Sequence, residues 1–373
     1  MNSGITNVPV GQGVGLAQAL NRDNNNFDLF RLFAALAVIY GHSFALTPSP
    51  GFDDVLFRLS GQNTAAMAVK FFFFLSGLLV TDSILIRKSL VQFFVARFFR
   101  IWPGLAFVVL VSIFIIGALA TKLDLASYFS DPKTYLYFKH QILMQTWGTQ
   151  SLGYYDLPGV FTENAYKNTV NASLWSLFPE VFAYLTLAAV FGVGLLEKRL
   201  ATLLILLILV DAVAPSRIIF TSLPMGNEDF SYLPFCFAAG AFFAIHKYSI
   251  VIDARLPVGF ALLFVLFQFN PNALYFFFLF AFTLALYLGT RRWIIERLRL
   301  PFDALYGVFL WGFPIQQMLA SYLPNVTGIT HCLIAMTLAG LAGILSWKLV
   351  EKPSISMGKK VARSISYSQS RPA

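Results

Sequence analysis

Residues 27–46 read FDLFRLFAALAVIYGHSFAL. An α-helix needs about 20 mainly apolar residues to cross the hydrocarbon of a bilayer, and in this run only Asp28 and Arg31 carry a charge. Nine more apolar runs follow, at residues 68–86, 101–121, 172–192, 200–214, 231–247, 256–270, 273–289, 304–323 and 330–350. Three of these are short for a span, which leaves a range of eight to ten. The sequence predicts an all-α fold, a polytopic transmembrane helical bundle of about ten helices.

The composition excludes a water-soluble fold of this length. Of the 373 residues, 57% are hydrophobic and 12% are charged, about half of the usual charged share of about 25%. The two cysteines form no cluster with histidines, so we expect no metal site. The net charge of +9 comes from short segments between apolar runs, so membrane topology explains it and no nucleic-acid partner is needed. Membrane lipids are the first partners that this composition predicts.

Lysine and arginine gather on one side of the predicted membrane. With the N-terminus placed inside, 20 of the 27 basic residues fall in inner segments and 7 in outer ones. Because positive charge accumulates in cytoplasmic loops, we predict a multi-pass protein of the cell (inner) membrane with both termini cytoplasmic. Residues 1–26 and 354–373 are then cytoplasmic tails, the first of them mobile, and residues 27–353 form the transmembrane domain. The sequence does not indicate an oligomeric state.

Two long segments lie between predicted spans. In residues 87–100, Ser89 followed by Gln92 predicts a helix cap, and the basic amphipathic stretch after it should lie in the interface before turning into a span at Pro103. Residues 122–171, on the outside, have aromatic and polar side chains that could bind a saccharide or, equally, form an aromatic belt at the membrane interface. Their aromatic and acidic candidates are Tyr128, Tyr135, Tyr137, Trp147, Tyr154, Tyr155, Asp156 and Tyr166.

Ionisable side chains at membrane depth are costly, so each one there is a candidate functional residue. Arg31 and His42 are eleven positions apart, about three helical turns plus 20°, so both point the same way about 16 Å apart. Asp28 lies about 40° from His42 on the same face. The three predict a polar stripe from the cytoplasmic end toward the outer leaflet, with His42 able to accept a hydroxyl proton. The alternative role for His42 is a hydrogen bond to a neighbouring helix.

A second set of candidates is Arg97 and Arg100, whose i,i+3 spacing makes them neighbours on a helix. Guanidinium groups bind phosphate in a planar fork, so together with Arg31 these residues predict a cationic mouth at the inner surface. An anchor for lipid headgroups is the alternative. Glu180 is the acid inside the fourth predicted span, and it would orient or protonate a histidine or hold a substrate hydroxyl. The alternatives are a structural ion pair and a proton-relay acid.

Polar and aromatic residues just before Glu180 complete the candidates. Asn171, Ser173 and Trp175 fit a helix cap followed by an interfacial tryptophan, and they also fit a substrate-binding segment.

These residues resemble the acyltransferase-3 family of membrane acyltransferases. Members of that family pair an arginine and a histidine in the first span, as Arg31 and His42 do. The other motifs of the resemblance occur in order: a Phe-rich Ser-Gly segment at Phe71–Gly77, Arg-x-x-Arg at Arg97 and Arg100, Leu-Trp-x-Leu-x-x-Glu at Leu174–Glu180, and Glu-Lys-Pro at Glu351–Pro353. The set covers residues 27–353. Two departures are Phe178-Pro179, where many members have Pro-Tyr, and the absence of a histidine from the ninth span.

The resemblance implies transfer of an acyl group, usually acetyl from acetyl-CoA, to a hydroxyl of a carbohydrate or another envelope molecule, as in polysaccharide O-acetylation. It implies the stand-alone form of the family, with acetyl-CoA as a substrate and no tightly bound cofactor. His42 would be the general base or a transient acyl carrier. The implied site residues are His42, Glu180 and Asp28 for catalysis, Arg31, Arg97 and Arg100 for the donor, and Asn171, Trp175 and Ser76 for the carbohydrate or glycolipid acceptor.

Two other functions fit the same residues. A secondary transporter or a flippase of a sugar-containing substrate would use Arg31, His42 and Glu180 as ion or proton sites. A non-catalytic membrane scaffold would need none of them. Dependence on acyl-CoA separates the first function from the other two.

Overall fold

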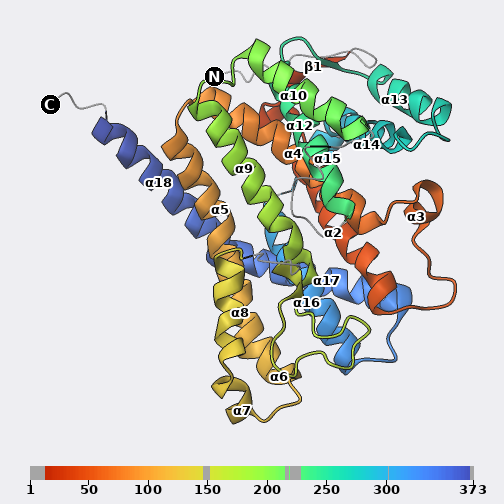
Figure 1. Ribbon diagram of the computed structural model, residues 1–373, viewed down its shortest axis with the longest axis vertical. Coiled ribbons are helices and arrows are strands. Elements are labelled where there is room, and N and C mark those ends of the chain that lie inside the picture. Colours follow the sequence, from red (N-terminus) through yellow and green to blue (C-terminus); the bar gives the residue numbers. More distant parts are fainter. Residues whose placement is uncertain (1–12, 146–151, 215–217, 219–227, 301, 370–373) are drawn as a thin grey trace.

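The computed structural model describes residues 13–145, 152–214, 218, 228–300 and 302–369, which form a bundle of α-helices (Figure 1). A helix overlaps each of the ten predicted apolar runs. These helices are α2 (Phe27–Leu46), α4 (Thr64–Arg87), α5 (Leu90–Val111), α9 (Leu177–Gly192), α10 (Lys198–Val213), α12 (Leu233–Ile245), α13 (Arg255–Leu266), α14 (Ala273–Gly289), α16 (Leu305–Tyr322) and α17 (Gly328–Ser346). Shorter helices connect them: α3 (Val55–Ser60), α6 (Ala118–Ala120), α7 (Leu125–Ser130), α8 (Pro132–Ile142) and α15 (Arg292–Arg297).

Five helical segments of the described chain are long and apolar enough to cross a membrane, namely Phe27–Leu46, Thr64–Arg87, Leu90–Ala120, Ala172–Gly192 and Gly328–Ile365. Three more apolar helices are shorter, at Asp229–Ile245, Arg255–Leu266 and Ala273–Gly289. The protein is therefore an all-α membrane bundle. Its helices satisfy their backbone hydrogen bonds internally, as the absence of water in hydrocarbon requires.

The helix α5 corrects one expectation. It runs without a break from Leu90 through Pro103 and continues through a π-helical turn at Ser112–Gly117, so the turn into the membrane expected at Pro103 is wrong. Proline removes a single backbone hydrogen bond, which neighbouring helices in a membrane bundle can compensate. The predicted cap is confirmed, because the Ser89 hydroxyl accepts a hydrogen bond from the Gln92 backbone N–H at 3.3 Å.

Small residues set the closest helix contacts. A Cβ atom on Gly77 of α4 would overlap the carbonyl oxygen of Phe237 in α12, and one on Gly240 of α12 would overlap that of Phe74 in α4. The two backbones touch because neither glycine has a side chain, which is the usual basis of close packing between membrane helices. The helix α4 also packs along α2, where Gly41 lies directly on Ala65. These contacts place α4 between α2 and α12.

Residues 13–26 were expected to be a mobile tail, but they are folded. Strand β1 (Val14–Gly15) pairs antiparallel with β2 (Val251–Ile252), and α1 (Leu16–Ala19) buries both of its terminal side chains completely. Burial of these apolar groups holds the segment against the bundle.

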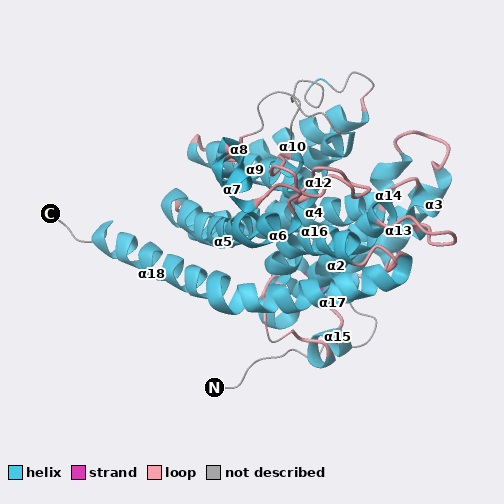
Figure 2. Ribbon diagram, turned by 90° about the horizontal axis from the view of Figure 1, so that it is seen from below, coloured by secondary structure: helices cyan, strands magenta, loops and turns pink. Residues whose placement is uncertain are grey.

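Residues 354–369, expected to be a tail, are likewise helical. They belong to α18 (Lys352–Gln369), which lies along α5 in Figure 1 and forms an edge of the bundle that extends beyond the other helices in Figure 2.

The outer aromatic segment is partly core. Tyr128 of α7 and Tyr137 of α8 are 0% and 2% exposed, and the Tyr128 hydroxyl donates to the Ile113 carbonyl oxygen at 2.9 Å. Neither side chain can face a saccharide or an interface, so the expectation is wrong for both. Tyr135 and Tyr154 are about half exposed, as expected. Trp147 lies outside the described residues.

Replacing Gly240 with leucine should separate α4 from α12 and lower the melting temperature of the detergent-solubilised protein. Overpacking of this kind costs about 1–3 kcal/mol or more. Gly340→Leu on α17 is the matched control, because a Cβ there meets no heavy atom of the described neighbouring elements within 4 Å. Equal melting temperatures for the two variants would contradict the packing.

Candidate active site

A cavity of about 760 Å³ opens among α2, α4, α5, α9, α16 and α18. Its described lining residues include seven basic and three acidic side chains: Arg22, Arg31, Arg87, Arg97, Arg100, Lys359 and Arg363, against Asp28, Glu180 and Asp303. Six predicted site residues from four helices meet here: Asp28, Arg31, Ser76, Arg97, Arg100 and Glu180. The excess of positive charge, in walls that are otherwise largely apolar, suits an anionic ligand.

The carboxylate of Glu180 is held by two hydroxyl groups. The Ser76 hydroxyl of α4 donates to Glu180 Oε1 at 3.3 Å, and the Tyr184 hydroxyl donates a short hydrogen bond to the same oxygen. Tyr184 lies one helical turn after Glu180 on α9, and its ring faces the Arg97 guanidinium at 5.7 Å. Residues of α4 and α9 thus bind one carboxylate oxygen, and Arg97 of α5 packs on the tyrosine that donates to it.

Two of the three predicted donor-binding arginines have carboxylate partners. Arg100 Nη1 and Nη2 donate to the two oxygens of Asp303 at 3.0 and 3.1 Å, a bidentate pair that joins α5 to the segment before α16. Arg31 lies 3.5 Å from Asp28, which also accepts a hydrogen bond from Arg22 at 2.7 Å, and this bond raises the pKa of Arg22.

The remaining cations of the cavity are not neutralised by acids. Arg87, Arg97, Lys359 and Arg363 have no ion pair with any described carboxylate. Arg97 Nε is buried without a hydrogen-bond partner in the described part of the chain. Arg97 as a whole is only partly buried and lines the cavity, so its guanidinium group can meet a ligand that enters it.

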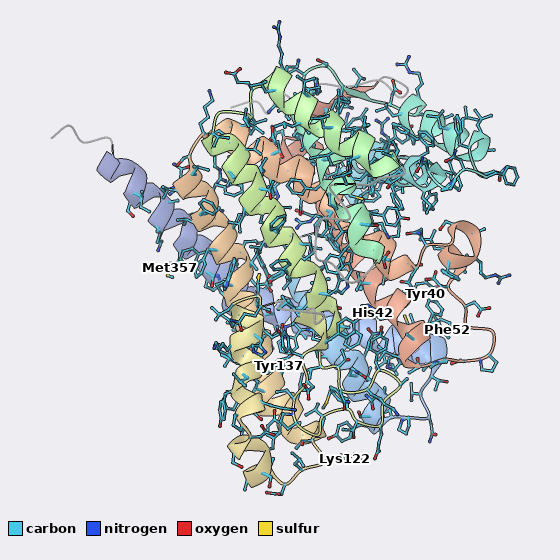
Figure 3. All side chains as sticks on the ribbon, in the orientation of Figure 1. Tyr40, His42, Phe52, Lys122, Tyr137 and Met357 are labelled. Atoms are coloured by element: carbon cyan, nitrogen blue, oxygen red, sulfur yellow. The ribbon has the colours of Figure 1, made fainter. Side chains whose placement is uncertain are left out.

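His42 is not among the described residues that line this cavity. Gly41 lies on Ala65, so His42 is about one helical turn beyond Val69, which does line the cavity. The imidazole packs edge-on against Phe313 of α16 at 5.1 Å, and its Nδ1 atom is buried with no hydrogen-bond partner among the described residues. Figure 3 shows His42 near the C-terminal end of α2, within the bundle.

The predicted polar stripe is therefore only partly in the cavity. Arg31 and Asp28 line it, whereas His42 does not, and aromatic side chains of α16 are found beside both. Phe309 lines the cavity one turn before Phe313 on α16, and its ring packs against Phe72 of α4 at 6.3 Å. Spacing along α2 carried no information on which side chains of α16 lie beside Arg31 and His42.

Asn171 and Trp175 are also outside the described lining. Asn171 Nδ2 donates to the Leu310 carbonyl oxygen of α16 at 2.9 Å, and its side chain makes no cap hydrogen bond, so the cap prediction is wrong. The Trp175 ring packs against Phe230 at 4.7 Å. These contacts hold the short helix η4 (Ala172–Ser176), and Ser176 and Leu177 directly after Trp175 reach the cavity.

Sequence reasoning missed several lining residues, and signals for some of them exist. Tyr184 follows Glu180 by four positions, the spacing of neighbours on one helix face. The α18 lining residues Ile355, Gly358, Lys359, Ala362 and Arg363 follow an i, i+3, i+4, i+7, i+8 pattern. Asp303 carried no such signal, because its partner Arg100 is 203 positions away.

The family model described as an acyltransferase domain, acyltransferase-3, matches residues 24–348. The fold and the match define an integral membrane acyltransferase, and the chain belongs to the acyltransferase-3 family. It is similar to an O-acetyl transferase of Shigella phage Sf6, with 28% identity over 341 residues that cover 88% of this chain and 95% of that relative. It also resembles nodulation protein 10 of Rhizobium leguminosarum bv. viciae, with 42% identity over 87 residues, 22% of each chain. No solved structure matches.

The Arg100–Asp303 pair should be energetically coupled. We expect Arg100→Gln and Asp303→Asn each to destabilise the protein by leaving a part-buried charge without its partner, and the double variant to lose less than the sum. The expected coupling is about 1–3 kcal/mol. Unfolding of the four proteins in mixed micelles measures it, and strictly additive losses would contradict the pair.

Proposed function

We propose that this acyltransferase moves an acetyl group from acetyl-CoA to a hydroxyl of an envelope or exported carbohydrate. The cationic cavity carries the proposal, because it places unpaired basic side chains beside the Glu180 carboxylate. The name of the phage relative, O-acetyl transferase, supports acetyl as the acyl group and oxygen as its acceptor. The cavity volume of about 760 Å³ falls in the range of about 300–1,000 Å³ that small-molecule sites occupy.

The donor would enter with its phosphates against basic side chains and its thioester toward Glu180. Arg97 is the strongest candidate for a phosphate contact, since it lines the cavity beside Tyr184 and has no ion pair with a described carboxylate. Arg31 and Arg100 would contribute charge while Asp28 and Asp303 fix their positions. Asp28, predicted to be catalytic, is then a positioning residue for Arg31.

The reaction would bring together Glu180, which lines the cavity, and His42, which is not in its described lining. The acceptor hydroxyl oxygen attacks the thioester carbonyl carbon, the carbon–sulfur bond breaks, and the hydroxyl proton passes through His42 Nδ1 to the leaving thiolate. Phe309 and Phe313 would have to shift for the acetyl group to approach His42. Ser76 and Glu180 would hold the acceptor hydroxyl. Asn171 and Trp175 would position the segment of chain that leads into Glu180.

The proposed membrane arrangement follows the basic residues. About ten spans, both termini in the cytoplasm and the cell (inner) membrane would place the mouth of Arg31, Arg97 and Arg100 on the side where acetyl-CoA is made. Residues 27–353 would form the transferase domain.

The proposal is tested with purified protein in lipid nanodiscs, radiolabelled acetyl-CoA and a surface polysaccharide extract as acceptor. We expect labelled polysaccharide and release of CoA, and a loss of about 100-fold or more in turnover for His42→Ala and for Glu180→Gln. His246→Ala is the control. His246 forms a hydrogen bond with Thr202, and it is not one of the described residues that line the cavity. Absence of any CoA release, with a transport defect in His42→Ala, would instead favour a transporter.

Arg97→Ala should weaken the donor more than the acceptor. Loss of a hydrogen bond to a charged group predicts a rise of about tenfold or more in the KM for acetyl-CoA, with little change in the KM for the acceptor. Arg255→Ala is the control, because Arg255 pairs with Asp253 outside the cavity. Equal changes in both KM values would contradict a phosphate contact.

A further inference from the structure

The helix α18 is part of the cavity wall and is held there by close packing. A Cβ on Gly358 would lie 2.8 Å from Cβ of Phe99, and Cγ of Glu351 lies 3.4 Å from the Cβ position of Gly104. The two contacts show that α18 runs antiparallel to α5 and continues toward the N-terminal end of α5 at Leu90. One face of α18 therefore borders the mouth of the cavity. Figure 1 shows the two helices side by side.

That face carries two basic residues one helical turn apart. Lys359 and Arg363 line the cavity together with Ile355, Gly358 and Ala362, and both are exposed. Neither has an ion pair with a described carboxylate. Lys360 is also exposed, but it is not among the described lining residues. The helix thus has two cations, Lys359 and Arg363, in the wall of the cavity, and the adjacent Lys360 is not part of that wall.

We infer that Lys359 and Arg363 bind the phosphomonoester at the nucleotide end of a CoA donor. This inference rests on the proposed function. If the thioester end lies near Glu180 and Ser76, the opposite end of an elongated donor lies at the mouth, where α18 ends the wall. A phosphomonoester carries a charge of about −1.5 to −2 at pH 7, more than either phosphate of a diphosphate bridge. A guanidinium fork and an ammonium group one turn away match such a group.

The assignment makes α18 a determinant of donor specificity. A donor that lacks the ribose phosphate still reaches Arg97 with its diphosphate, but it leaves Lys359 and Arg363 without a ligand. Wild-type protein should therefore prefer CoA over 3′-dephospho-CoA. The same two cations could instead hold the phosphate of an anionic lipid, since the chemistry is shared.

The experiment measures the affinity of CoA and 3′-dephospho-CoA by calorimetry, with full-length protein in nanodiscs of phosphatidylcholine alone or with added phosphatidylglycerol. We expect Lys359→Ala and Arg363→Gln each to weaken CoA by about tenfold, as for loss of a charge-assisted hydrogen bond. Both should bind 3′-dephospho-CoA within about twofold of wild type, in either membrane. Lys360→Ala should bind both ligands as wild type does.

Three results overturn the inference. Equal weakening of the two ligands would give α18 a structural role only, and unchanged affinity for CoA would remove the contact altogether. An effect that appears only with phosphatidylglycerol would assign the cations to lipid. Failure of the wild-type protein to bind CoA, or to release it from acetyl-CoA, refutes the proposed function itself and is visible before any variant is made.

Discussion

Arg100 and Asp303 form the ion pair on which the geometry of the site depends. A charged group in a membrane bundle is stable only against a partner or a polar cavity, and Arg100 has both. Its two hydrogen bonds join α5 to the start of α16, which sets the spacing of two cavity walls. Glu351 lies behind this pair, 1% exposed, with Oε1 accepting a hydrogen bond from Ser346 at 3.0 Å. Gly104 and Gly307 lie against Glu351, and because neither has a side chain, the carboxyl group fits between them.

Much of this architecture could be predicted because hydrocarbon imposes a simple rule on sequence. Apolar runs of sufficient length gave the helices, and rare charges within them gave Asp28, Arg31 and Glu180. The i,i+3 spacing in the basic segment between two runs gave Arg97 and Arg100, and all five residues line one cavity. The helix cap at Ser89 was predicted from its local spacing to Gln92. These successes share a cause, since each depends on residues that are close in sequence or on the cost of a buried charge.

The errors arise where distant segments decide the outcome. Helical periodicity predicted that His42 faces the same way as Arg31. It could not predict that Phe313, from another helix, packs on the imidazole, or that His42 is not in the described lining of the cavity. Tyr128 and Tyr137 look like surface aromatics in the sequence, yet both are buried. The Ile113 carbonyl oxygen, in the π-helical turn that follows α5, accepts a hydrogen bond from the Tyr128 hydroxyl. Residues 354–369 are polar enough to suggest a tail. The helical spacing of their lining residues is visible in the sequence, but the packing of Gly358 on Phe99 identifies the helix that they cover.

The length of α5 has a consequence for where charge resides in the bilayer. Its continuous helical segment has 31 residues, or about 46 Å at 1.5 Å each, whereas the hydrocarbon is about 30 Å thick. About 16 Å must therefore be taken up by tilt or stand in the headgroup layers. Arg97 and Arg100 lie about 10 and 15 Å from the start of the helix at Leu90. With the surplus at that end, both guanidinium groups lie at the polar boundary, where an anion can reach them without crossing hydrocarbon.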